Sequence, residues 1–410
     1  MNRRSLIAYS AIAISACLAP RAARAQVDPW LVQDFDELWR TLSERYCFFE
    51  DKAVGWDHVR ALYRPQVEAV GNRDDFARIV RNVLAELYDA HTHLNQEWNG
   101  APRWPPFDVR VQADGSAAVV TDVMSGSSAE ANGVRAGDRI VAVEGVPVLE
   151  AAQRFMPNCL TRPDPEAEAY ALNVAVSGRR GAARRFEIAR GDRGLMIDLP
   201  TTGGEARPDL AFERLDGGIG RITIASFGST DTIEAFDRAL ETLQDGPGLI
   251  IDVRGNGGGD TAVARPIMGR FIAERMPYAA MRRRQGSGLS ESWLEYVDPR
   301  GPFTYERPVV VLTDAWSASM AEGFPMGMRA IGRGRIVGRP MMGLGAAVFQ
   351  LRLDRSGLEL QYSAEPVYTP QGHPRWRIRP DVETEPGQDI LQAGLTELHR
   401  LIALDSRFDR

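Results

Sequence analysis

Hydrophobic residues recur at helical spacing near both ends of the chain. Between residues 28 and 50, one helical face carries Trp30, Phe35, Leu38, Trp39 and Leu42. A second helix is predicted over 72–87, with Asn72 near its N-terminus as a cap, and another over 390–404. Together, the first two predicted helices indicate a small helical unit that ends near Asn95.

The middle of the chain shows the period-two alternation of β-strands instead. Strands are predicted at 107–111, 118–123, 139–143 and 185–190, with a turn at 134–138. The Pro- and Gly-rich stretch 98–106 and the polar stretch 191–208 are interpreted as the connectors on either side. This pattern indicates a β-rich unit between two others.

The remaining half alternates strands with helices. Strands are predicted at 220–225, 249–253 and 308–313, and the helices that follow them at 231–243, 261–272 and 319–330. Further strands are predicted near 335–338, 347–353 and 358–362. Alternation of this kind predicts an α/β core with a partly parallel sheet.

The first 25 residues have the features of a secretory signal peptide. Arg3 and Arg4 precede an apolar run from Leu6 to Ala19, and Ala23-Arg24-Ala25 is a small-x-small cleavage site. The arginine pair indicates the twin-arginine route, and Cys17 leaves a lipoprotein signal as the alternative. We therefore expect a periplasmic or secreted protein.

Composition and charge narrow the partners and the chemistry. The net charge of −6 gives no bulk attraction to nucleic acid or to anionic membranes, and no later segment is long and apolar enough to cross a bilayer. Lys52 is the only lysine, so almost no amine can serve as a general base. Beyond the signal peptide, Cys47 and Cys159 could form a disulfide or remain two buried thiols.

A serine at a strand-to-helix junction is the first candidate for chemistry. The apolar strand 309–313 runs into Ser317-Ala-Ser319 and then into a helix. The free N–H groups and partial positive charge of a helix N-terminus favour an oxyanion there. The alternative is that Ser317 or Ser319 only caps the helix.

Two other segments could contribute polar groups. A buried strand ends in Asp252-Val-Arg254-Gly-Asn256 and three further glycines, which allow close approach of a ligand or form a tight turn. A phosphate-binding loop is not predicted, because the Gly-Lys-Ser/Thr ending is missing. His91 and His93 lie two apart, with no nearby acid or cysteine in the spacing that a zinc site needs.

Taken together and in this order, these motifs resemble the C-terminal processing (tail-specific) serine peptidases and the related tricorn-type core peptidases. The motifs are 119–148, which resembles the PDZ domain of that family, 249–259, 317–322, 338–343, 368–372 and 379–381. The resemblance implies a ClpP/crotonase-like α/β core at 209–410, an inserted PDZ-like domain at 98–198 and an N-terminal helical unit at 27–97 after the signal peptide at 1–25.

The resemblance also assigns roles to residues. Ser319 matches the nucleophile, and the N–H groups of Met320 and Gly228 match the oxyanion hole. Where many members have a catalytic lysine this chain has Leu344, so a Ser–Lys dyad is rejected. The tricorn-like branch uses a histidine from an Asp-x-His-Thr motif.

That motif is Asp89-Ala-His-Thr92 here, which makes His91 the expected base and His93 the second candidate. The branch places a serine before this histidine and a glutamate close before the last Pro-Asp. This chain has Ala90 at the first position and no glutamate between Gly372 and Asp381. Glu365 is the nearest acid and is the predicted partner that orients His91.

The resulting hypothesis is an exported serine endopeptidase that acts on polypeptides without a metal or cofactor. The PDZ-like domain would hold a substrate C-terminus by strand addition. The alternative is a catalytically silent peptide-binding protein on the same fold, which the missing lysine, Ala90 and the absent late glutamate favour. The sequence leaves the oligomeric state open.

Overall fold

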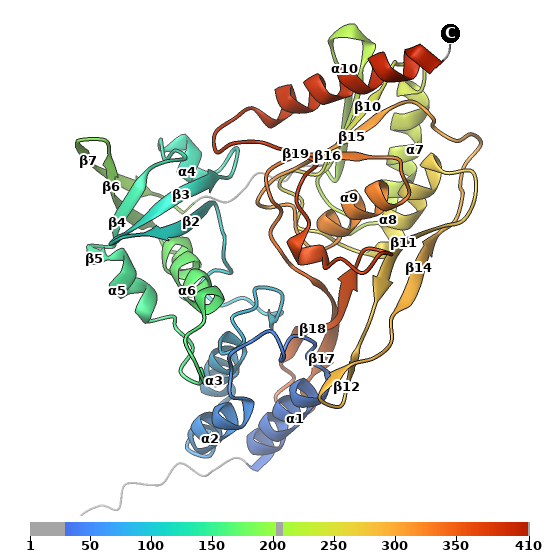
Figure 1. Ribbon diagram of the computed structural model, residues 1–410. Helices are drawn as coiled ribbons and strands as arrows, with labels where there is room; N and C mark the ends of the chain where they lie inside the picture. Colours follow the sequence, from blue (N-terminus) through green and yellow to red (C-terminus); the bar gives the residue numbers. More distant parts are fainter. Residues whose placement is uncertain (1–28, 202–207, 409–410) are drawn as a thin grey trace, which may run out of the picture.

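The chain forms three lobes that follow one another in sequence (Figure 1). The computed structural model describes residues 29–201 and 208–408. The expected signal peptide, with Cys17, lies outside the described residues. The three lobes are called here the N-terminal lobe (29–97), the middle lobe (98–201) and the C-terminal lobe (208–408).

The N-terminal lobe is built from three amphipathic helices. They are α1 (Pro29–Arg45), α2 (Trp56–Val67) and α3 (Arg73–Ala85). The Asn72 side chain accepts from Asp75 N at 2.9 Å, as expected for the cap of α3. The sequence pattern did not predict α2, although it buries Trp56, Val59, Tyr63 and Val67, because Pro65 within it argues against a helix.

This lobe does not have a hydrophobic core of its own. Its helices pack against a hairpin from the far end of the chain, made of β17 (Ala346–Arg352) and β18 (Glu359–Tyr368). The short strand β1 (His93–Leu94) pairs antiparallel with β18, with His93 opposite Gln361. The N-terminal lobe is therefore fixed to the C-terminal lobe, just after the turn that carries His91.

The middle lobe is a sheet with helices packed against it (Figure 1). Its strands are β2 (Val109–Asp114), β3 (Ala117–Val123), β4 (Arg139–Val143), β5 (Val146–Pro147), β6 (Arg184–Arg190) and β7 (Arg193–Leu199). Its helices are α4 (Ser128–Ala131), α5 (Val148–Gln153) and α6 (Pro165–Ser177). The strand order is β2-β3-β4-β6-β7, with β5 on β4, so β2 and β7 are the edges.

Interpreting 191–208 as a connector was partly wrong. Residues 193–199 form β7, which pairs with β6 along its whole length. A two-residue turn joins the strands, and Gly191 in it has φ 58°. Leu195, Ile197 and Leu199 alternate as a strand requires, so the signal was present and was outweighed by the polar residues around it.

The C-terminal lobe contains the predicted α/β core. Its sheet has the order β19-β16-β15-β10-β9-β8 and is parallel from β19 to β9. The strands are β8 (Leu210–Arg214), β9 (Gly220–Ile224), β10 (Leu249–Asp252), β15 (Val309–Thr313), β16 (Arg335–Gly338) and β19 (Val382–Glu383). The helices are α7 (Asp231–Leu243), α8 (Thr261–Met268), α9 (Met320–Ala330) and α10 (Ile390–Phe408).

Alternating side chains let this sheet bury both faces. Ile251 and Val311 pack in the cluster that includes residues of α7, α8 and α9, whereas Ile250, Val310 and Leu312 pack with Leu398 of α10. A second sheet extends the lobe towards the N-terminal helices. It joins β1, β17 and β18 to β11 (Met276–Met281) and β14 (Trp293–Val297), next to the small hairpin of β12 (Arg284–Gln285) and β13 (Gly288–Leu289).

Two further expectations from the sequence bear on these residues. Cys47 and Cys159 are both buried free thiols rather than a disulfide. Among the described residues, every helix is too short or too polar to cross a lipid bilayer.

Candidate active site

Ser319 lies where β15 ends and α9 begins, with backbone angles that a simple helix cap does not need. Its φ is 53° and its ψ is −113°, whereas N-cap residues usually have β-region angles. A non-glycine residue in such a conformation costs on the order of 1–3 kcal/mol, and strain of this kind is concentrated at functional sites. The geometry therefore favours a serine held up at a sharp turn over a serine that only caps α9.

The buried carboxylate of Glu322 holds this turn together. It accepts from Ser319 N at 3.0 Å, from Leu344 N at 2.7 Å and from Gly343 N at 3.2 Å. Burial raises the pKa of Glu322 to about 7, although the Arg375 cation and the three N–H donors act in the opposite direction. In the sequence, Glu322 is recognisable only as part of a motif. Its hydrogen bonds, which connect Ser319 to the loop at 343–344, are visible only in the structure.

Glu322→Gln should therefore lower stability and displace Ser319 without removing any reacting group. A glutamine has one oxygen, so at least one of the three N–H groups would face an NH₂ group in a fully buried site, at a cost of about 1–3 kcal/mol. We expect thermal unfolding several degrees lower and an acylation rate reduced about tenfold or more. Glu306→Gln is the matched control, on the exposed side of the same lobe, and should change neither. An unchanged unfolding temperature for Glu322→Gln would contradict this positioning role.

The glycine-rich loop after β10 packs directly against the serine. A Cβ on Gly258 would lie 2.8 Å from Ser319 Cβ and 3.0 Å from Met320 N, and its φ is +109°. Buried Asn256 fixes the loop, because its Nδ2 donates to Ile224 O at 2.9 Å and its Oδ1 accepts from Gly258 N at 2.7 Å. The loop is thus a tight turn and also one wall of the serine site.

The two predicted oxyanion donors lie on either side of this loop. Met320 N–H is the first of α9 and has no acceptor within the helix. A Cβ on Gly259 would lie 2.7 Å from Gly228 N, so Gly228 also borders the loop. Gly228 N, however, donates to Ser226 Oγ at 2.9 Å and would have to exchange that bond to serve an oxyanion.

His91 is buried in the turn that follows α3. Its N–H donates to Asp89 Oδ1 at 2.9 Å, and its carbonyl accepts from Gln361 Nε2 at 3.1 Å. The Nδ1 of its imidazole is buried without a hydrogen-bond partner among the described residues. Burial lowers the pKa of His91 to about 4, against the attraction of Asp89 and with a contribution from Arg375. The imidazole is therefore neutral at pH 7 and can accept a proton.

The acid that acts on His91 is Asp89 rather than Glu365. Asp89 Oδ2 accepts from Thr92 Oγ1 at 2.7 Å and from Ser363 Oγ at 2.8 Å, which ties the His91 turn to β18. Glu365 also lies on β18, but its carboxylate accepts from Arg283 Nε and Nη2. Neither a hydrogen bond nor an electrostatic shift links Glu365 to His91, so nothing in the structure supports its predicted role.

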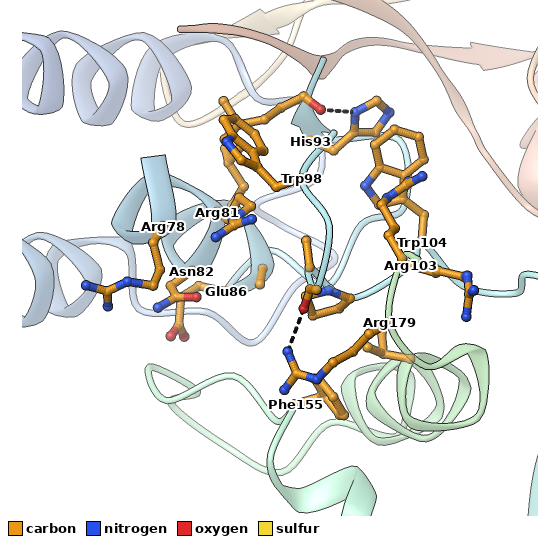
Figure 2. Close-up of a pocket in the computed structure, with 18 of the residues that line it drawn as sticks. Arg78, Arg81, Asn82, Glu86, His93, Trp98, Arg103, Trp104, Phe155 and Arg179 are labelled. Carbon is orange, nitrogen blue, oxygen red and sulfur yellow. Dashed lines mark hydrogen bonds between the residues drawn. The ribbon is translucent and has the colours of Figure 1, made fainter. Parts of the chain in front are cut away.

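His93, the second candidate base, is engaged elsewhere. Its ring stacks on Trp104 with 3.7 Å between ring centroids, and its Nδ1 lies 3.0 Å from Leu94 O. Figure 2 shows it at the edge of a pocket between the N-terminal and middle lobes. Ser319 does not line this pocket.

Buried Arg375 connects the surroundings of His91 with those of Ser319. Its guanidinium donates to Leu344 O and Ala346 O, and its charge acts on both His91 and Glu322. No hydrogen bond within the described chain joins the His91 imidazole to the Ser319 hydroxyl. Catalytic hydrogen bonds often reach their full strength only when substrate binds.

No lysine takes the place of His91 at Ser319. Leu344 occupies the expected lysine position and donates its N–H to Glu322. Lys52 lies closer to the His91 turn than its sequence position indicates, but its Nζ donates to Tyr88 O at 3.4 Å and pairs with Glu166 at 3.7 Å. The prediction that rejects a Ser–Lys dyad is consistent with this arrangement.

The middle lobe contacts the serine turn directly. Trp316, three residues before Ser319, donates from Nε1 to Phe107 O at 2.9 Å. Arg339 Nε donates to Asp122 Oδ1 at 2.6 Å, and Arg110 Nη1 donates to Met341 O at 3.2 Å. A ligand on the middle lobe could therefore influence the loops around Ser319.

Known proteins resemble this chain over most of its length. The C-terminal processing peptidase of Tetradesmus obliquus, a chloroplastic protein, is 24% identical over 395 residues, which are 91% of this chain and 81% of that protein. Tricorn protease homolog 1 of Streptomyces coelicolor is 24% identical over 331 residues, which are 75% of this chain but only 28% of that protein. The solved structure of mature CPAF has a TM-score of 0.61 at 15% identity and covers 92% of this chain and 97% of that chain, which shows a shared fold.

Family models match one part of each lobe. The tricorn protease C1 domain matches residues 32–85, a PDZ domain matches 119–156, and peptidase family S41 matches 218–384. These matches confirm the predicted fold of an α/β peptidase core with a PDZ domain and an N-terminal helical region. Residues 218–384 thus match peptidase family S41, and the chain is a serine-type peptidase.

Proposed function

We propose that this protein is an endopeptidase in which Ser319 attacks the peptide carbonyl and His91 accepts its proton. The strained backbone of Ser319 at the start of α9 carries the proposal. The neutral, buried imidazole of His91 supports it, because a serine needs an adjacent base to react near pH 7. The N–H groups of Met320 and Gly228 would stabilise the oxyanion, with Gly228 released from Ser226 when substrate binds.

Each step uses groups of this chain and water. Attack by Ser319 Oγ forms a tetrahedral intermediate while its proton passes to His91. His91 then returns the proton to the leaving amine, which leaves an acyl-enzyme. Water, deprotonated by His91, hydrolyses the ester and releases Ser319.

We assign Asp89, rather than Glu365, the role of orienting the His91 turn. Asp89 binds the His91 backbone N–H and attracts the imidazolium electrostatically, but no side chain holds His91 Nδ1. This orphaned nitrogen is the observation that favours the alternative, a peptide-binding protein that does not cleave. A fluorophosphonate probe separates the two: Ser319-dependent labelling of the folded wild type supports the peptidase, and no labelling supports the silent binder.

Residues 1–25 also bear on the compartment in which the protein works. We propose that they direct export and are removed, so that the peptidase works in the periplasm or outside the cell. Mass spectrometry of the N-terminus of the protein from a periplasmic extract tests this. An intact Met1 on cytoplasmic protein would contradict it.

The PDZ domain is proposed to hold a substrate C-terminus, but part of its β2 edge is already bonded by a side chain of the same domain. At β2, Val111 N donates to Asn173 Oδ1 at 3.0 Å, and Asn173 Nδ2 donates to Val111 O at 3.0 Å. The N–H and C=O of Val111, which a strand added at β2 would use, are thus satisfied by Asn173 of α6. A peptide added to this edge must first displace the Asn173 side chain.

Asn173→Ala should therefore strengthen binding of a C-terminal peptide at β2, by about tenfold if the two freed hydrogen bonds re-form with the peptide. Fluorescence anisotropy of a labelled peptide on the Ser319→Ala background measures this without cleavage. Asn132→Ala, in the same domain but with its amide on the Ser128 carbonyl, is the control. Equal affinity in both variants would show that peptides do not enter at β2.

A further inference from the structure

A pocket of about 770 Å³ opens between the N-terminal lobe and the PDZ domain. Figure 2 shows it bordered by α3, by the segment that carries Trp98 and Trp104, and by the Phe155 and Arg179 regions of the PDZ domain. Its size is that of a ligand site. Ser319, His91 and β2 do not line it, whereas Thr92 and His93 do, so it lies outside the serine site but next to the turn that carries His91.

Arginines dominate its charged lining. Six arginines line it, against four carboxylates. Three of those carboxylates are already engaged, since Asp75 pairs with Arg78, Glu97 pairs with Arg180, and buried Glu86 accepts from Tyr63, Asn158 and Cys159 N. The pocket therefore has more positive charge than its own acids balance.

Three of the arginines lack a carboxylate partner. The Arg81 side chain has neither a hydrogen bond nor an ion pair within the described residues, and its guanidinium lies 5.1 Å from the centre of the Trp98 ring. Arg103 donates to the carbonyls of Ser177 and Ala182, and Arg179 donates to Gly100 O. Burial and neighbouring Arg78 lower the pKa of Arg81, as expected for a cation without a counter-ion.

The positions of these arginines indicate what the ligand is. They come from α3, from the connector and from the end of α6, and Figure 2 shows them on different sides of the opening. One carboxylate would not reach all three, whereas a chain with several carboxylates would. The rings of Trp98 and Phe155, which also line the pocket, suit apolar side chains. Although the whole chain has a net charge of −6, the excess of positive charge in this pocket favours an anionic ligand there.

We infer that this pocket binds an acidic, partly apolar peptide segment, with Arg81, Arg103 and Arg179 pairing with its carboxylates. The inference deepens the proposed function, on which it rests in one respect: the segment belongs to the polypeptide substrate. Guanidinium–carboxylate pairs in a partly buried, aromatic-lined site are among the stronger polar contacts. The pocket would hold a part of the substrate that lies outside the serine site.

The test is fluorescence anisotropy of the Ser319→Ala full chain with an N-terminally fluoresceinated, C-terminally amidated peptide that alternates Glu with Leu and Phe. The same peptide with Gln in place of Glu is the comparison, and the amide removes any contribution from a free C-terminus. We expect the Glu peptide to bind at least about tenfold more tightly than the Gln peptide, with affinity that falls as salt rises. Equal binding of the two peptides would overturn the inference.

Matched variants locate the site. Arg81→Gln should weaken binding of the Glu peptide about tenfold. Arg78→Gln, one turn earlier on α3, should change it by less than about twofold, because Arg78 is exposed and paired with Asp75. Asn82→Glu, which adds a negative charge at the rim without removing a contact, should also weaken it. Equal affinities in Arg81→Gln and Arg78→Gln would place the peptide elsewhere.

The result is independent of catalysis. Binding is measured on a chain without the proposed nucleophile, so a failure of fluorophosphonate labelling would refute the peptidase mechanism and leave this pocket untouched. Conversely, a chain that cleaves polypeptides but binds both peptides equally would refute the pocket alone.

Discussion

Ser319→Ala should abolish fluorophosphonate labelling and lower cleavage of an unfolded polypeptide by about four to six powers of ten. Loss of the nucleophile removes the acyl-enzyme route, and the remaining rate would come from the oxyanion site and substrate binding alone. Gel-based labelling and the rate of cleavage of a fluorescent, unstructured protein measure the two effects. The substitution should leave the fold intact, because alanine removes only one oxygen.

Ser317→Ala is the matched control, two residues earlier in the same turn. Ser317 Oγ donates to Val253 O at 2.9 Å and accepts from Asp314 N at 3.0 Å, so its loss should reduce stability. Labelling of the folded fraction should remain. If Ser317→Ala loses labelling and Ser319→Ala keeps it, the assignment of the nucleophile is wrong.

His91→Ala should slow acylation of Ser319 by a similar factor, because His91 is the base that we propose takes the proton of the serine. In the wild type, the acylation rate should stay high as the pH falls below 6.5 and decline with a midpoint near 4, since burial lowers the pKa of His91 to about 4 and only the neutral imidazole is a base. Labelling with the fluorophosphonate probe for fixed times, at pH values from about 3.5 to about 8, measures this profile.

The lowered pKa of His91 also makes the unfolding free energy depend on pH. The folded pKa of His91 lies below its usual 6.5, so the unfolded chain takes up this proton first as the pH falls. Its contribution, up to about 3 kcal/mol above pH 6.5, is therefore lost between pH 6.5 and 4. His91→Ala should make the unfolding free energy less dependent on pH in that window.

Two controls separate His91 from its neighbours. His93→Gln should keep the rate and the low midpoint, because His93 stacks on Trp104 rather than facing the serine. If the rate also shows a step near pH 7 that disappears in Glu322→Gln, that step is due to titration of Glu322, whose pKa is about 7. A single midpoint at 6.5 that survives Glu322→Gln would contradict a buried His91 as the base.

Local patterns in the sequence were sufficient for the elements of the α/β core and for their order, but not for α2 or β7. The alternation of strands and helices after residue 220 predicted the α/β core, because each element must bury one face or stripe at its own period. The position of Ser319 at a strand-to-helix junction followed from the same pattern. The sequence also predicts that there is no Ser–Lys dyad, because Lys52 is the only lysine and Leu344 stands at the expected lysine position.

Contacts between distant segments were decided only by the tertiary structure. Pairing of β1 with β18 brings the His91 turn to residues some 270 positions away, and no local period encodes that register. Glu322 and Arg375 became visible as the groups around Ser319 only when burial and hydrogen bonds were known. Glu365 was chosen by distance along the chain, whereas its carboxylate is bound by Arg283.

The sequence thus determined which chemistry this protein can use, because residue types and local periods set the available groups and the elements that carry them. Where those groups point, which of them are charged, and which edge or pocket is open were decided by packing between lobes. The physical reason is that burial and the approach of charges depend on neighbours in space, as the neutral imidazole of His91 and the unpaired guanidinium of Arg81 both show.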